Sequence, residues 1–171
     1  METTFLSALW FLPFVLPICI LAAFNDMKSM KIPNFLVLAL LATFIVIGPF
    51  ALGFETWAWR LTHFVVVLFC GILLYATRQL GAGDAKFAAA MAPFVARADF
   101  GMFFSLVAAC LIIALIGHRI LGAIPAIRNR TPDWASWTTD PDARWYKRRF
   151  PVGLSLAMSL VIYYLLALYA G

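Results

Sequence analysis

Residues 5–24, with the sequence FLSALWFLPFVLPICILAAF, contain no charged side chain and decide the fold class. A helix needs about 20 apolar residues to cross the hydrocarbon core of a bilayer, and this run has that length. Four further apolar runs of comparable length follow along the chain, at residues 35–54, 57–75, 100–116 and 152–169. The sequence therefore predicts an all-α, polytopic membrane protein with helices near these ranges.

Composition supports this fold class. Hydrophobic residues make up 64% of the chain and charged residues 12%, whereas soluble domains carry about 25% charged residues. The net charge of +5 does not indicate nucleic acid binding, because the basic residues gather at the ends of the apolar runs and in the loop at 125–150. Cys19, Cys70 and Cys110 lie inside apolar runs without CxxC spacing, which predicts neither a zinc site nor a disulfide.

A sixth segment, residues 84–96, is shorter and begins at a glycine-rich turn, so it could span the bilayer or re-enter it. If it spans, eleven of the thirteen lysines and arginines share one face of the membrane, and only Arg60 and Arg97 lie on the other. If it does not, the basic loop at 125–150 moves to the opposite face. The positive-inside rule thus favours about six transmembrane helices, a cytoplasmic loop at 125–150, and both termini outside the cytoplasm.

The chain length predicts a single membrane domain covering residues 1–171. No basic segment precedes the first apolar run, and Lys28 and Lys31 follow it directly. That order of charges is typical of an uncleaved first helix whose second end lies in the cytoplasm.

Two acids, Asp26 and Asp84, remain at the cytoplasmic face in this topology, each at the end of a predicted helix. Taken singly, Asp26 could be an interfacial acid beside two lysines, and Asp84 could cap the helix that follows it. Taken as a pair, two carboxylates brought close together do not both ionise easily, so one holds a proton. The ionised group can then take a proton from water while the protonated group hydrogen bonds to a peptide carbonyl. This is the chemistry of an aspartic peptidase, and it needs neither a metal nor a cofactor.

The sequence around the two acids resembles a known family. Asp26 precedes Ile32-Pro33-Asn34, and the second motif is Gly81-Ala82-Gly83-Asp84-Ala85-Lys86-Phe87. In this order and with this topology, the motifs resemble the type IV prepilin peptidases, which are membrane aspartic peptidases with one aspartate in each motif. Pro151-Val152-Gly153 is similar, more weakly, to the Pro-x-Gly start of the last helix in that family. The resemblance implies Asp26 and Asp84 as the catalytic pair, and supporting or substrate-binding roles for Gly81, Gly83, Lys86, Pro33 and Asn34.

The resemblance also implies a substrate and a location. Family members cleave the basic leader from prepilins at the cytoplasmic boundary of the bacterial inner membrane, so the expected partners are the bilayer and a prepilin with its leader and apolar N-terminal helix. Larger members carry a cytoplasmic segment with paired CxxC motifs and also methylate the new N-terminus. This chain lacks that segment and resembles the short peptidases of tight-adherence (Flp) pili, so no methyltransferase activity is expected.

Alternatives remain open from the sequence. A small proton- or cation-coupled transporter could use the same acids, but it would place them deeper in the bilayer and show internal symmetry. A pilus-assembly partner without catalytic activity is a second alternative. The loop at 125–150, with Trp134, Trp137 and Trp145, is either a flap that touches substrate or, as we favour, a linker with aromatic anchors. We expect His63 and His118 to serve in packing rather than in a proton relay.

Overall fold

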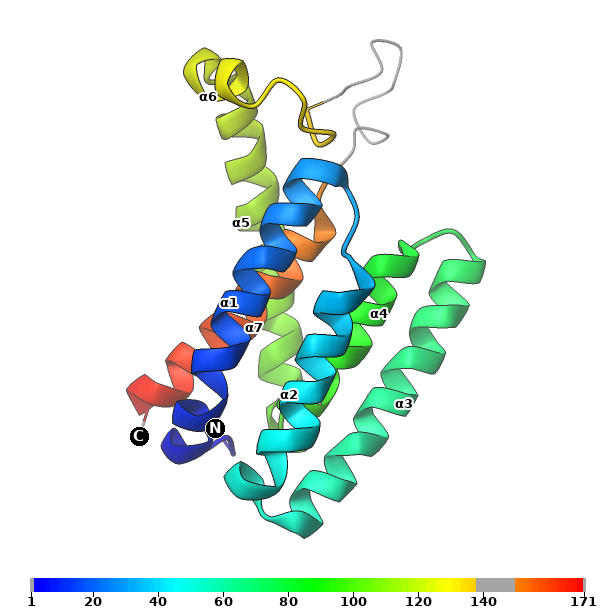
Figure 1. Cartoon of the computed structure of the whole chain (residues 1–171), viewed down its shortest axis with the longest axis vertical. Coiled ribbons are helices and arrows are strands. Elements are labelled where there is room, and N and C mark those ends of the chain that lie inside the picture. The colour runs from blue at the N-terminus through cyan, green and yellow to red at the C-terminus, as the bar shows by residue number, and fades with distance from the viewer. Residues whose placement is uncertain (1, 138–149, 171) are drawn as a thin grey trace.

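The computed structural model describes residues 2–137 and 150–170, and these residues form helices without any strand. The α-helices are α1 (Phe5–Ser29), α2 (Asn34–Leu52), α3 (Phe54–Ala76), α4 (Ala82–Met91), α5 (Phe100–Ala123), α6 (Pro125–Arg130) and α7 (Val152–Ala170). Two 3-10 helices, η1 (Ala92–Phe94) and η2 (Arg97–Asp99), connect α4 to α5. Figure 1 shows the long helices side by side as a bundle.

Among the described residues, five helices are long and apolar enough to cross a membrane, namely α1, α2, α3, α5 together with η2, and α7. The expected all-α, multi-pass membrane protein is therefore confirmed in its class. The sixth expected helix, at 84–96, is divided: α4 ends at Met91, and Pro93 lies in the 3-10 turn that follows. Proline lacks the N–H that an α-helix would need there. With 10 residues, α4 is about 15 Å long, about half the thickness of a hydrocarbon core.

The buried core lies between α1, α2, α7 and the short α4–η1 segment. Its centre is aromatic: Phe11 of α1 contacts the rings of Phe44, Phe94 and Tyr164, which come from α2, η1 and α7. The helices α3 and α5 contribute no member to this fully buried cluster and pack on its outside, α3 against α4 and α5 against α7. The short helix α4 is therefore held inside the bundle although it is too short to span alone.

The two ends of the bundle differ in what they bring together (Figure 1). The end of α1 and the starts of α2, α4 and α7 lie at one end, which we call the aspartate end because it carries Asp26 and Asp84. The start of α1 and the end of α7 lie at the other. There Asp99, which is buried, accepts hydrogen bonds from the backbone N–H of Thr3 and from the Tyr163 hydroxyl.

Several boundaries differ from those expected. The first apolar run ends at Phe24, but α1 continues to Ser29, so Asp26 lies in the last turn of the helix instead of after it. Met30 caps the end of the helix: its backbone is left-handed (φ 54°), and its N–H donates a hydrogen bond to the carbonyl of Asp26. The predicted loop at 125–150 begins with the helix α6, and its residues 138–149 lie outside the described part of the chain.

Candidate active site

Asp26 is buried, with 4% of its surface exposed, and its carboxylate faces the start of α7. The backbone N–H of Gly153 donates a hydrogen bond of 2.7 Å to Oδ2 of Asp26, and the N–H of Leu154 also faces this carboxylate. The first N–H groups of a helix have no partner within the helix, and the helix dipole is positive there. The start of α7 is therefore an anion site that Asp26 occupies with a fixed orientation.

Gly153 leaves no room for a side chain at this contact. A Cβ on Gly153 would lie 2.8 Å from Oδ2 of Asp26 and 2.6 Å from Cδ1 of Ile32, both closer than real Cβ contacts. The weakest of the three sequence motifs, Pro151-Val152-Gly153, thus contacts the first motif directly. The sequence predicted that Gly153 lies at the start of the last helix. It gave no sign that this glycine contacts Asp26, which is 127 residues away in the chain.

Asp84 lies in the first turn of α4, outside the five helices of spanning length, and is partly buried. Burial, together with the negative charge of nearby Asp26, raises the pKa of Asp84 to about 6. Within residues 2–137 and 150–170, no hydrogen bond donor reaches the Asp84 carboxyl group. The structure therefore brings the two acids into electrostatic contact, with backbone donors on Asp26 alone.

The two glycines before Asp84 have different surroundings. A Cβ on Gly81 would lie 2.7 Å from Oδ2 of Asp84, so only glycine leaves space for that carboxyl group. A Cβ on Gly83 would lie 3.4 Å from the backbone nitrogen of Ile32, in the turn between α1 and α2. Gly81 thus makes room for Asp84, whereas Gly83 lets the start of α4 approach the turn that follows Asp26.

The remaining residues of the two motifs connect helices and do not touch the carboxyl groups. The Nζ atom of Lys86 donates a hydrogen bond of 3.3 Å to Oδ1 of Asn34, and both side chains lie at the surface of the bundle. Pro33 precedes the first residue of α2 with an extended backbone. These residues tie the start of α2 to α4 and so contribute to the spacing of the segments that carry the two acids.

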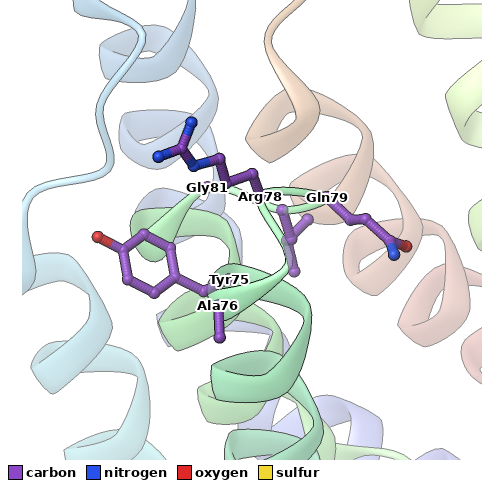
Figure 2. Close-up of a pocket in the computed structure, with 6 residues that line it drawn as sticks. Tyr75, Ala76, Arg78, Gln79 and Gly81 are labelled. Carbon is purple, nitrogen blue, oxygen red and sulfur yellow. The ribbon is translucent and has the colours of Figure 1, made fainter.

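A cavity of about 520 Å³ lies at the connection between α3 and α4, before the helix that carries Asp84. Its lining includes Tyr75, Arg78, Gln79 and Gly81, which Figure 2 shows around the turn between the two helices. Gly81 both lines this cavity and borders Asp84, because a Cβ on Gly81 would lie 2.7 Å from Oδ2 of that acid.

The first part of the loop at 125–150 packs on the aspartate end. The N–H of Ala135 donates a hydrogen bond of 2.8 Å to the carbonyl of Lys28, and Trp134 packs edge-on against Phe24 of α1 with ring centroids 5.6 Å apart. Trp137 stacks on His118 of α5, with ring centroids 4.7 Å apart. Residues 134–137 thereby link the C-terminal end of α1 to the C-terminal part of α5. Trp145 lies outside the described residues.

No metal site is evident in the part of the chain that the structure describes. No group of three or more His, Cys, Asp or Glu side chains there could hold an ion. His118 packs against Trp137, and His63 packs against Phe100 with ring centroids 4.8 Å apart.

A multi-pass helical bundle with two interacting carboxyl groups at one end is a membrane protein with a candidate acid–base site. The model of the type IV leader peptidase family matches residues 13–118, more than half of the chain and a range that includes both acids. The chain belongs to this family, as the two motifs predicted. Neither the comparison with curated proteins nor that with solved structures found a match. Membership implies a membrane peptidase acting on a prepilin and gives the transporter alternative no support.

Proposed function

We propose that Asp26 and Asp84 form the catalytic dyad of a membrane aspartic endopeptidase that removes the basic leader from Flp-like prepilins. One observation carries this proposal: two carboxyl groups from motifs 58 residues apart interact at one end of the bundle, so that burial and the charge of Asp26 raise the pKa of Asp84. Perturbed carboxyl groups of this kind are typical of acid–base sites.

The two acids have different roles because their surroundings differ. Asp26 accepts backbone N–H groups at the positive end of α7, which stabilise a negative charge, whereas Asp84 has no such donors and lies beside the charge of Asp26. Asp26 is therefore the general base and Asp84 the protonated general acid. The proton belongs to the pair, and its apparent titration reports both groups.

Hydrolysis then proceeds through a water molecule held between the two acids. Asp26 accepts a proton from this water as the water oxygen bonds to the scissile carbonyl carbon, and Asp84 donates its proton to the carbonyl oxygen. The first step thus gives a tetrahedral diol. In the second step the proton on Asp26 passes to the amide nitrogen, the C–N bond breaks, and Asp84 regains a proton from a hydroxyl group of the diol, which becomes the carboxyl group of the leader. Protons and atoms balance without a covalent intermediate, a metal or another cofactor.

The aspartate end faces the cytoplasm in this proposal, and both termini lie outside it in the bacterial inner membrane. The support is the charge distribution, because Lys28, Lys31, Arg78 and Lys86 lie in or next to the turns of the aspartate end. Positively charged residues accumulate on the cytoplasmic side of membrane proteins. A leader on that side would reach the dyad at the membrane boundary. Methyltransferase activity is not part of the proposal, since the chain has no segment with paired CxxC motifs.

The test is leader removal from a co-expressed Flp-like prepilin, followed as a loss of mass. We expect wild-type protein to process the prepilin, and Asp26→Asn and Asp84→Asn each to leave it unprocessed at equal protein levels. Asp133→Asn is the matched control, because Asp133 is an exposed acid of the loop after α6 that contacts neither carboxyl group. Processing at the wild-type rate by either dyad variant would exclude the proposed mechanism.

A further inference from the structure

An apolar groove of about 360 Å³ runs along the outer side of the contact between α1 and α7. Its floor is formed by small residues, with Cys19 of α1 and Ala157 of α7 both nearly fully buried. Its walls include Ile20, which is 58% exposed, and Met158. The groove thus has an apolar lining that follows the direction of two packed helices.

The shape and lining of the groove fit a helix. In a bilayer, helices associate mainly through close packing, and small residues allow their backbones to approach. The α1 residues of the lining recur at intervals of three and four positions, from residue 16 to residue 23, so they form one continuous stripe. A third apolar helix can lie along this stripe and against the facing stripe of α7.

One end of the groove opens at the candidate site. Ala23, at this end, lies three residues before Asp26, which is less than one helical turn. Leu154, at the same end, follows Gly153, and its backbone N–H faces the carboxylate of Asp26. A chain that left a helix in the groove and continued in extended form would therefore pass beside Asp26 within a few residues.

We propose that this groove binds the apolar N-terminal helix of the prepilin, so that the residues preceding that helix are delivered to Asp26. The inference rests on the proposed function, and it names the part of the substrate that supplies binding. The groove itself supports this choice of occupant, because its lining is apolar and its residues Ala23 and Leu154 lie next to Asp26. In this arrangement the apolar helix supplies binding, and the distance from that helix determines which peptide bond is cleaved.

Site-specific photo-crosslinking tests where the helix binds. A photoreactive amino acid is placed at Ile20 or Met158 in the groove, and at Ile113 on the outer face of α5, which is 58% exposed and serves as the lipid-facing control. The protein in lipid nanodiscs is mixed with the prepilin, or with the same pilin lacking its leader. We expect crosslinks to both forms from positions 20 and 158 and none from position 113. Crosslinks to lipid alone, or equal crosslinking from all three positions, would overturn the inference.

A kinetic test uses residues at the groove wall whose replacement does not disturb the core. Ile20→Trp fills part of the groove, so the KM for the prepilin should rise by about 10-fold while kcat stays near its wild-type value, as expected when binding is lost without a change in chemistry. Ile113→Trp should change neither constant. An unchanged KM in Ile20→Trp contradicts the inference. Loss of the proposed function would appear differently, as leader removal that persists in Asp26→Asn or Asp84→Asn, or that is missing in the wild type.

Discussion

Replacing Gly153 by alanine should remove most of the peptidase activity and leave the helical bundle folded. The new Cβ would lie 2.8 Å from Oδ2 of Asp26 and 2.6 Å from Cδ1 of Ile32. Both atoms are the ends of side chains that can rotate, so the backbone of α7 need not move. Rotation of the Asp26 carboxyl group, however, breaks the 2.7 Å hydrogen bond from the N–H of Gly153 and turns the base away from its position.

The size of the effect follows from that contact. A hydrogen bond to a charged group contributes about 1.5–3 kcal/mol, which corresponds to a factor of about 10 to 150 in rate. A displacement of a catalytic group by about 1 Å costs about 100-fold. We therefore expect kcat to fall by about 100-fold in Gly153→Ala. The free energy of unfolding should change by only about 1 kcal/mol, at the low end of the cost of overpacking, because two side-chain ends absorb the extra methyl group.

The assay is the initial rate of leader removal by purified protein, together with its thermal stability. Gly117→Ala in α5 is the matched control, because a Cβ there has nothing within 4 Å. Gly153→Ala combined with Ile32→Val separates the two contacts: it removes Cδ1 of residue 32 but keeps the contact with Asp26, so activity should stay low. Wild-type activity in Gly153→Ala, or full recovery in the double variant, would refute the reasoning.

The remaining predictions concern Asp84. Because burial and the charge of Asp26 raise its pKa from the ordinary 3.8 to about 6, the folded protein retains a proton there that the unfolded chain releases at lower pH. The free energy of unfolding should therefore fall as pH rises from 3.8 to about 6, and leader removal should decline above about pH 6 as the general acid loses its proton. In Asp26→Asn, infrared titration of the carboxyl group should show a lower pKa for Asp84, because the neighbouring negative charge is gone. An unchanged pKa would contradict the electrostatic contact between the two acids. Gly81→Ala places a Cβ 2.7 Å from Oδ2 of Asp84, whereas the nearest contact of a Cβ in Gly83→Ala is 3.4 Å. Initial rates of leader removal should therefore show a lower kcat for Gly81→Ala than for Gly83→Ala. Equal rates would argue against this role of Gly81.

Much of the architecture could be predicted from the apolar runs, because each needs a bilayer of known thickness. Helix ends were less predictable. The polar residues from Asn25 onward end the first run, but at a membrane boundary water and neighbouring backbone satisfy polar side chains, so α1 continues to Ser29. Likewise, residues 84–96 form one apolar segment by composition, yet Pro93 divides it into α4 and η1.

The candidate site was predictable only in part. Counting membrane crossings placed Asp26 and Asp84 at one face, but their proximity depends on which helices are neighbours. Helices in a bilayer are apolar on all sides, so hydropathy does not reveal which face packs inward. The contact of Gly153 with Asp26 has no local signal either, since it arises from the packing of α1 against α7.

The position of Asp26 against α7 has a consequence for the synthesis of the protein. The donors that orient this carboxylate belong to the first turn of α7, which the ribosome makes after every other helix that the structure describes. A nascent chain that ends before residue 152 already contains both aspartates but lacks the N–H groups that fix one of them. Under the proposed mechanism, the general base is therefore oriented only once α7 has been made and has packed against α1.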